Sequence, residues 1–384
     1  MSSLRKIMTV SIAALLSVST LAACGTASAS GTTSSSTSSN AEASTATSLS
    51  NFGSMSALEK AAEAEGSLNV IALPHDWSNY GEVIAAFKKK YPKIKVNEAN
   101  PNASSKEEID AIKTNAGTDA APDTVDVGLA VAATSTKYFA PYKVKAWSSI
   151  DSSLKEKSGL YTAGYTGIMS VGWNKTKYGS ITKLSDLLKS KFAGTVALNG
   201  KPAEAGAAFN GFLMANALSG GTLTNLKPGL AFFKKLETAG NLTQVDVTDA
   251  TIDSGQTGVV FDWTYNQESY QKSLKAKGID WEYKTFPKAQ VVSYYNQAIN
   301  KQAPHPAAAR LWEEFLYSAQ AQNLWLKGGS TPVLLTQMKK DGTVNKTILA
   351  DQPQLTGKAI AYTNDDSTRI TTWLQNNWDK TIGN

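Results

Sequence analysis

The distribution of apolar and polar side chains from residue 66 to 340 predicts strands that alternate with helices. Residues 67–73 form a short apolar run typical of a buried strand, and apolar side chains then recur at helical spacing up to Tyr91. We expect Ser78 to cap this helix and Pro92 to end it. Further strands are predicted at residues 94–96, 124–131, 170–173, 195–198, 258–261 and 291–299, and further helices at 182–191, 205–218, 228–239 and 306–326. Such alternation is typical of α/β layers around largely parallel sheets, in which ligands bind beyond the carboxyl ends of strands.

The N-terminus has the pattern of a secretory signal. Arg5 and Lys6 precede an apolar stretch without charges, residues 7–21. This stretch is shorter than the about 20 apolar residues that a helix needs to span a bilayer. It therefore predicts a signal peptide, residues 1–23, and not a transmembrane anchor.

Cys24 is the only cysteine of the chain, so no intrachain disulfide can form. Residues 21–24, Leu-Ala-Ala-Cys, resemble the lipobox of bacterial lipoproteins, in which the cysteine is acylated and becomes the first residue. The resemblance implies lipidation of Cys24 and attachment to the outer face of the cell membrane. The alternative is a free thiol in a secreted protein. Residues 24–56 are rich in Ser, Thr, Ala and Gly, which predicts a disordered tether.

From residue 57 the composition becomes that of a globular chain, and about 330 residues are enough for two domains of ordinary size. The formal net charge is +6, but Lys and Arg form no dense run. Nucleic acid is therefore a poor candidate partner, and we expect a monomer.

The sequence lacks the motifs of common catalytic and cofactor sites. It contains two histidines, His75 and His305, and no HExxH, Walker A, GxGxxG or GxSxG segment. We therefore expect no metal, no cofactor and no enzymatic activity. Acidic residues are numerous, so the sequence is compatible with a pair of catalytic carboxylates for glycoside hydrolysis. A surface-tethered hydrolase is therefore the alternative class of protein.

Aromatic and acidic side chains gather where predicted strands end. Residues 75–80 follow the first strand, residues 261–266 follow a later one, and residues 293–296 lie within a third. A carboxylate neutralises a cationic ligand, and an aromatic face attracts it by about 1–2 kcal/mol when water is excluded. The clusters therefore predict a cation site. The alternative is that the rings are half-buried packing and that Asp76 and Asp262 cap helices.

Residues 66–96 resemble the start of spermidine/putrescine-type periplasmic binding proteins, in which a strand leads into an Asn/Asp-Trp-x-x-Tyr loop and a helix. Asp76, Trp77 and Tyr80 match that loop in type and spacing. The segments that are similar to the wider group, which includes iron(III), thiamine and phosphonate-binding proteins, are residues 167–174, residues 184–188 with 192–194, and residues 303–308 with 314–316. The chain thus resembles an extracellular solute-binding protein of an ABC transporter through most of residues 66–340.

This resemblance implies a two-lobed, hinged clamp of the type II periplasmic-binding-protein fold, with the ligand in the cleft between the lobes. Closure would be a hinge motion, and the closed form would deliver the ligand to an ABC permease and ATPase complex. The expected boundaries are 57–168 plus 262–330 for lobe 1 and 169–261 plus 331–384 for lobe 2, with crossings near 167–172 and 261–263.

The ligand that the resemblance favours is a polyamine or other small organic amine. Trp77 and Tyr80 match aromatic contacts of polyamine binders, but Lys201 stands where a companion acid is expected. Iron(III) or another small solute is the alternative, because Tyr294 and Tyr295 are similar to the adjacent tyrosines of iron(III) binders. The predicted ligand-binding residues are Asp76, Trp77, Tyr80, Glu204, Asp262, Trp263, Tyr265, Tyr294 and Tyr295.

Overall fold

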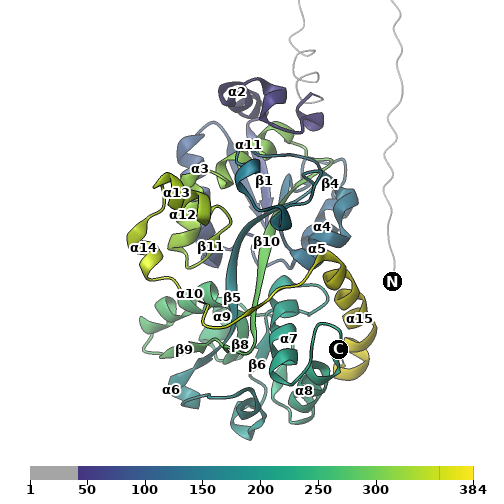
Figure 1. Ribbon diagram of the computed structural model, residues 1–384, viewed down its shortest axis with the longest axis vertical. Helices are drawn as coiled ribbons and strands as arrows, with labels where there is room; N and C mark the ends of the chain where they lie inside the picture. Colours follow the sequence, from purple (N-terminus) through teal and green to yellow (C-terminus); the bar gives the residue numbers. More distant parts are fainter. Residues whose placement is uncertain (1–41, 354, 384) are drawn as a thin grey trace, which may run out of the picture.

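The computed structural model describes residues 42–353 and 355–383 and places them in two α/β lobes stacked along the long axis of the molecule (Figure 1). The predicted fold class, a two-lobed α/β clamp, is confirmed. The signal peptide predicted at residues 1–23 and the lipidation site at Cys24 lie outside the described residues.

The strands are β1 (Ser67–Ile71), β2 (Lys95–Ala99), β3 (Thr124–Gly128), β4 (Phe139–Ala140), β5 (Thr162–Asn174), β6 (Val196–Leu198), β7 (Leu242–Thr243), β8 (Val259–Trp263), β9 (Trp281–Lys284), β10 (Gln290–Asn300), β11 (Thr331–Pro332) and β12 (Ala359–Ile360). The α-helices are α2 (Met55–Glu65), α3 (Tyr80–Lys90), α4 (Ser105–Thr114), α5 (Leu129–Thr134), α6 (Lys175–Tyr178), α7 (Gly206–Leu218), α8 (Lys227–Thr238), α9 (Asp249–Asp253), α10 (Thr264–Lys275), α11 (Pro306–Leu316), α12 (Ala319–Lys327), α13 (Leu335–Asp341), α14 (Lys346–Ala350) and α15 (Asn364–Ile382).

The long strands β5 and β10 run side by side through both lobes (Figure 1). In the first lobe β10 pairs with β3 and β4, and in the second lobe β5 pairs with β8 and β9. The chain passes between the lobes along β5 and returns along β10, so these two strands are antiparallel. Parallel pairing is confined to β1–β2, β6–β7, β6–β8 and β10–β12 among the described strands, so the expectation of largely parallel sheets is wrong at the centre. The residue boundaries of the lobes stay a prediction.

The end of β3 and the start of α3 differ from the predicted boundaries of these elements. The strand predicted at 124–131 ends at Gly128, where the chain turns directly into α5. A Cβ on Gly128 would lie only 2.8 Å from Gly206 Cα, so the two lobes touch at this turn. Asn79, and not Ser78, occupies the N-cap position of α3.

Two predicted helices differ from the observed elements because side chains cap the backbone inside them. The helix predicted at 306–326 is divided into α11 and α12, because Ser318 caps the second helix by accepting a hydrogen bond from Ala321 N. Residues 182–191 form two 3₁₀ turns, because the Asp186 carboxylate accepts from the backbone N–H groups just before it.

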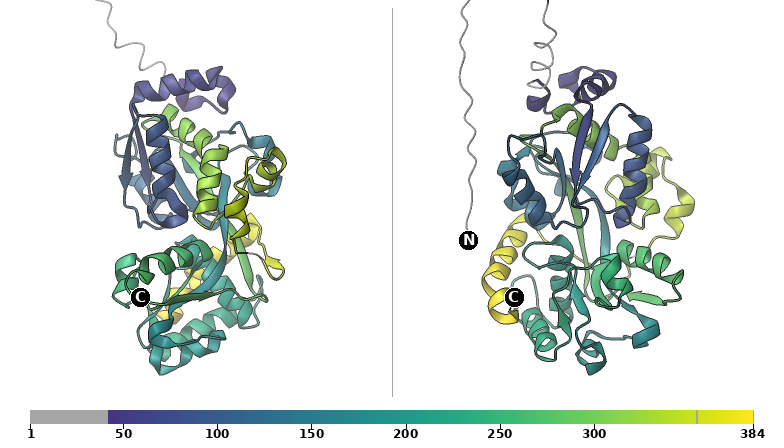
Figure 2. Two further views of the ribbon diagram at one scale, coloured as in Figure 1. Left: turned by 90° about the vertical axis from the view of Figure 1, so that its left-hand side faces the viewer. Right: turned by 180° about the vertical axis from the view of Figure 1, so that it is seen from behind.

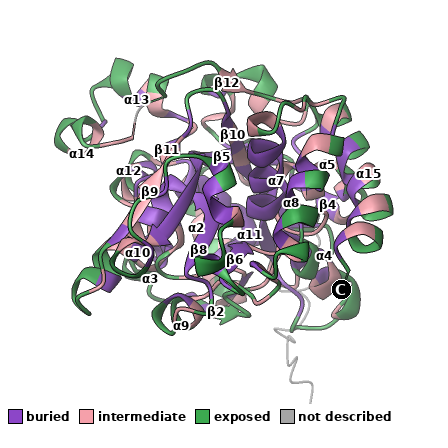
Figure 3. Cartoon of the chain, turned by 90° about the horizontal axis from the view of Figure 1, so that it is seen from below, coloured by how far each residue is buried: buried purple, intermediate pink, exposed green. Residues whose placement is uncertain are grey.

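Helix α7 is a core helix at the centre of the second lobe (Figure 3). Eleven of its 13 residues are buried, as expected for a helix that is apolar on all sides. Its small residues allow close packing, since a Cβ on Gly211 would lie 2.9 Å from the Leu198 side chain. The core therefore fixes the position of the first turn of α7, which lies at the junction of the lobes.

Residues 42–56, which the composition assigns to the tether, pack on the first lobe. Arg310 of α11 is buried and donates to the main-chain oxygens of Ala46 (Nε, 2.8 Å), Ser44 (Nη2, 2.9 Å) and Pro306 (Nη1, 2.9 Å). Because these carbonyl oxygens solvate a buried guanidinium, this segment belongs to the folded lobe as the structure describes it.

Helix α15 lies along one side of the molecule and packs against α5 and α8 (Figure 2). The segment before it is fixed by Tyr362, whose Oη donates to Ser293 Oγ (2.7 Å) and to Asn210 Oδ1 (2.9 Å). Within the described part of the chain, no helix is both long enough and apolar enough to cross a membrane.

Candidate functional site

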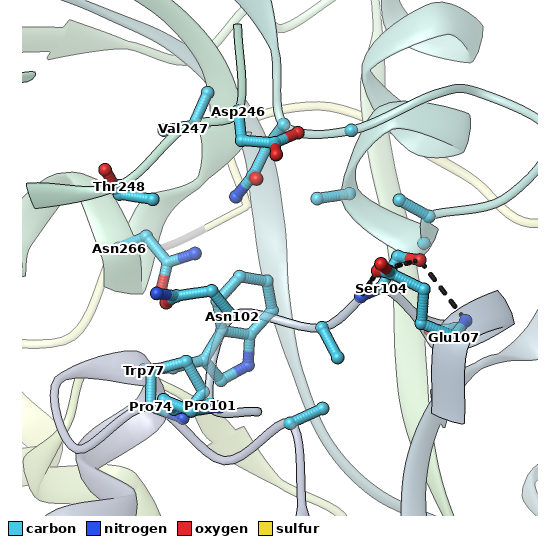
Figure 4. A pocket seen from close by; sticks show the side chains of 18 of the residues that line it. Pro74, Trp77, Pro101, Asn102, Ser104, Glu107, Asp246, Val247, Thr248 and Asn266 are labelled. Carbon is cyan, nitrogen blue, oxygen red and sulfur yellow. Dashed lines mark hydrogen bonds between the residues drawn. The ribbon is translucent and has the colours of Figure 1, made fainter. Parts of the chain in front are cut away.

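A cavity of about 720 Å³ lies between the two lobes (Figure 4). One wall consists of the loop after β1 and of residues 101–108 at the start of α4. The other wall consists of residues 199–207 after β6, residues 246–250, and the first turns of α10 after β8. The cavity thus lies beyond the carboxyl ends of β1, β6 and β8, as the sequence predicts, and its volume is within the usual range for small-molecule sites.

Trp77 stands in the first wall, and its loop is shaped by the second half of the chain. Ser78 and Asn79 adopt positive φ angles, and Gly328 packs so closely that a Cβ there would lie 2.6 Å from the Asn79 side chain. Nε1 of Trp77 donates a hydrogen bond to Tyr165 Oη (2.8 Å). With its N–H bound, the indole is held in place beside the cavity.

Asp126 also lines the cavity, and it connects Trp77 to both long strands. Its carboxylate accepts from Tyr165 Oη on β5 (2.6 Å) and from Gln297 Nε2 on β10 (2.7 Å). Burial raises the pKa of Asp126 to about 7, although these hydrogen bonds lower it. The wall of the cavity is therefore bonded directly to the strands that join the lobes.

Two carboxylates meet across the cavity: Asp76 from the first lobe and Asp249 from the second. Both side chains line the cavity, and Asp76 is close enough to raise the pKa of Asp249. Partial burial and the neighbouring charges of Asp76 and Asp253 together raise the pKa of Asp249 to about 6, while Lys277 opposes the shift. Two neighbouring carboxylates repel each other when both are ionised, and a proton or another cation between them relieves the repulsion.

Acidic side chains outnumber basic ones around the cavity by seven to two. Glu107 is engaged in capping α4, where it accepts from Ser104 N (2.7 Å). Glu108 is buried and accepts from Asp126 N (2.9 Å), and burial raises its pKa well above the usual range. Even with Glu108 and Asp126 protonated, carboxylates outnumber ammonium groups, so the potential inside the cavity is negative.

Asp262 shapes the second wall from behind, because it is fully buried and does not line the cavity. Its carboxylate accepts hydrogen bonds from Trp263 N (2.7 Å), Asn199 Nδ2 (2.9 Å), Asn266 Nδ2 (3.0 Å) and Tyr270 Oη (3.1 Å). Burial raises its pKa to about 6, and these bonds oppose the shift. Three of its partners, Asn199, Asn266 and Tyr270, do line the cavity, so Asp262 orients them.

The structure brings some of the predicted ligand-binding residues to the cavity and places others behind it. Those that line the cavity are Asp76, Trp77, Glu204 and Tyr295. Those that are buried behind its walls are Tyr80, Asp262, Trp263 and Tyr265. Tyr294 does not line the cavity, because neighbouring side chains on a strand point to opposite faces. The roles of these residues in binding stay predictions.

Several cavity residues are absent from the sequence-based prediction. The sequence contains a feature that could have predicted Asp126 as a cavity residue, since it is a charged residue inside an otherwise apolar predicted strand. Asn199 had a weaker one, since it directly follows a predicted strand. Asp249 had none, because its importance arises from a contact with the opposite lobe. Among the residues that the structure describes, no group of three or more His, Cys, Asp or Glu side chains is placed to hold a metal ion.

Two lobes, a pair of connecting strands and an interlobe cavity define a solute-binding protein of the periplasmic type. The chain belongs to the bacterial extracellular solute-binding protein family, whose model matches residues 123–357. It is therefore an extracellular solute-binding protein of the ABC-importer type, and such proteins bind small ligands and work with a permease and an ATPase. The resemblance noted from the sequence is confirmed at this level.

Solved structures of periplasmic binding proteins share the fold. AfuA from Actinobacillus pleuropneumoniae, with exogenous fructose-6-phosphate bound, is 20% identical over 83% of this chain and 98% of its own, with a TM-score of 0.60. AgtB from A. tumefaciens R10, in complex with agropinic acid, is 14% identical over 83% and 99%, with a TM-score of 0.63. The ferric binding protein from Campylobacter jejuni is 17% identical over 82% and 99%, with a TM-score of 0.59. No curated protein sequence matches the chain.

Proposed function

We propose that the protein captures a small organic amine outside the cell and delivers it to an ABC importer. The observation that carries this proposal is the charge of the cavity, which has seven acidic side chains and two lysines. A negative cavity concentrates ammonium groups and repels ligands that carry only anionic groups. Trp77 adds an aromatic surface, on which a cation gains about 1–2 kcal/mol once water is excluded. Polyamines are members of this ligand class.

Asp76 and Asp249 form the centre of the proposed site. An ammonium group between them would replace the repulsion of two carboxylates by attraction to both. Because the two residues belong to opposite lobes, such a ligand binds the closed form more tightly than an open one and shifts the population toward closure. We propose Trp77, Glu204 and Tyr295 as further contacts, since they line the same cavity.

We also propose that Cys24 carries the lipid that holds the protein at the outer face of the cell membrane. The support is the apolar stretch before it and the small residues that directly precede it. A lipid-anchored protein would meet its permease as a monomer at the end of the tether.

The test is isothermal titration calorimetry against putrescine, spermidine, 4-aminobutyrate, 2-aminoethylphosphonate, thiamine and ferric citrate. We expect an amine to bind, and Asp76→Asn and Asp249→Asn each to weaken it about tenfold or more, because a hydrogen bond to a charged group contributes about 1.5–3 kcal/mol. Asp379→Asn is the matched control, since Asp379 is an exposed acid on α15 outside the cavity. Binding of ferric citrate without binding of any amine would show that the proposal is wrong.

A further inference from the structure

The cavity has a second pole, at the first turn of α7, which differs from its acidic surroundings. The N-cap residue, Ala205, offers no side-chain acceptor, and the first turn contains no acidic residue. Within residues 42–353 and 355–383, no acceptor binds the N–H groups of Gly206, Ala207 or Ala208. Gly206 and Ala207 line the cavity, so these free donors and the positive end of the helix dipole adjoin it.

The hydroxyl group of Tyr295 lies at the same pole. The side chain is 93% buried, since its exposed fraction is 7%, yet it lines the cavity. Its Oη lies 3.0 Å from the position of a Cβ on Gly206. The O–H of Tyr295 finds no acceptor in the described part of the chain, and the buried indole N–H of Trp263 has no hydrogen-bond partner there either. A hydroxyl group with a free hydrogen beside free backbone N–H groups can donate to an acceptor that enters the cavity, either water or a ligand.

Lys201 supplies positive charge to this pole. It lies in the loop that leads into α7, lines the cavity, and forms no ion pair with any residue that the structure describes. The other lysine of the cavity, Lys106, is paired with Asp110 (2.7 Å). Lys106 N donates to Glu204 O (3.1 Å), which brings the loop of Lys201 against the start of α4.

The two poles draw on different segments of the cavity wall and meet at Tyr295, whose ring centroid lies 5.3 Å from that of Trp77. Figure 4 shows Trp77, Asn266 and Thr248 on one side and Ser104 and Glu107 at the start of α4 on the other. The acidic pair comes from the chain positions next to Trp77 and Thr248 and lines the same cavity. The loop before α7 belongs to the second side, because it is hydrogen-bonded to α4.

We infer that the ligand is a zwitterion, an amine that also carries an oxyanion group such as a carboxylate or a phosphonate. Its ammonium group lies between Asp76 and Asp249, and its oxyanion accepts from the first N–H groups of α7 and from the Tyr295 hydroxyl, with Lys201 nearby. This inference rests on the proposed function and narrows the ligand class. It also accounts for a lysine in a cavity that is otherwise acidic.

The experiment compares ligands that differ only in their ends. Calorimetry measures the affinities of 4-aminobutyrate and 2-aminoethylphosphonate, of the diamine putrescine, and of the dicarboxylate succinate. We expect at least one zwitterion to bind tenfold or more tightly than putrescine and succinate. Comparing the affinity of 4-aminobutyrate with that of 2-aminoethylphosphonate shows whether this pole binds a carboxylate or a phosphonate more tightly.

The variant Tyr295→Phe tests the pole directly, because it removes only the hydroxyl group. We expect it to weaken the zwitterion about tenfold or more, to weaken putrescine far less because the aromatic ring is kept, and to leave the melting temperature unchanged. Tyr138→Phe is the matched control, a tyrosine of the first lobe outside the cavity.

Four outcomes would overturn the inference. If putrescine binds more tightly than every zwitterion, or if Tyr295→Phe does not change the affinity for the zwitterion, the proposed oxyanion site at the second pole is wrong while the amine proposal stands. If succinate binds and the amines do not, both fail. Absence of binding by every zwitterion also contradicts the inference.

Discussion

Asp262 illustrates how one side chain can control a binding site that it does not touch. Its carboxylate lies behind the second wall, and its hydrogen bonds hold Asn199, Asn266 and Tyr270 at the surface of the cavity. From the sequence, Asp262 was expected to contact the ligand directly. The position after a strand was informative, but the direction of the side chain depends on strand pairing.

We predict that Asp262→Ala lowers the free energy of unfolding by about 3 kcal/mol or more, because it leaves buried donors without an acceptor. Ligand affinity should fall as well, since the cavity residues held by Asp262 lose their anchor. Denaturant titration and calorimetry on the same preparation measure both quantities. Asp76→Ala is the contrasting variant, because Asp76 is exposed at the cavity and its loss should weaken binding at unchanged stability. A fully stable Asp262→Ala variant would contradict this view.

At the scale of elements, the sequence predicted most strands and helices but not how far they extend. Helix α7 was predicted within one residue, because a long apolar run that ends at paired glycines is a local signal. Strand β5 was predicted at residues 170–173 only, since its earlier half mixes glycine, threonine and tyrosine. Its full length follows from pairing with β10, a partner that local patterns do not reveal.

The candidate site was predictable to a similar degree. Trp77 and Asp76 were found because a recognisable loop carries them. Asp126 and Asp249 were missed, because one looks like an irregularity in a strand and the other acquires its role only when the lobes meet.

The N-terminal segment provides a prediction at this scale. A chain shortened to begin at residue 54 loses the carbonyl oxygens of Ser44 and Ala46, so Arg310 keeps only Pro306 O among its three acceptors. We expect a lower melting temperature, because a buried guanidinium with unsatisfied donors is costly. Arg310→Met in the full chain should make the melting temperature less sensitive to the same truncation, although the loss of buried Ala43 and Ala46 remains. Equal melting temperatures of the long and short chains with Arg310 present would contradict the prediction.

For the whole molecule, the pair formed by Asp76 and Asp249 couples closure to pH. Because the pKa of Asp249 is raised to about 6, the pair is fully ionised only above that pH. In the free protein its contribution to stability is present below the unfolded pKa, near 4, and is lost as pH rises through about 6. A bound ammonium group reverses this trend, since it needs both carboxylates ionised.

We therefore predict that amine affinity is constant from pH 8 to 7 and falls as pH is lowered through 6 to 5, by up to about tenfold per pH unit. Calorimetry at each pH in buffers of equal ionic strength measures this dependence. Asp249→Asn should bind more weakly at pH 8 and show a flatter profile. A wild-type affinity that rises on acidification would show that the ligand is not held by these carboxylates.

The chain contains nine tryptophans, and Trp77 is the one that lines the cavity among the residues that the structure describes. Its indole N–H stays bound to Tyr165 while its ring adjoins the space that a solute fills. A solute that binds in the cavity therefore replaces water beside the indole ring of this one tryptophan. The fluorescence of Trp77 should therefore report whether a solute is bound, without any added label.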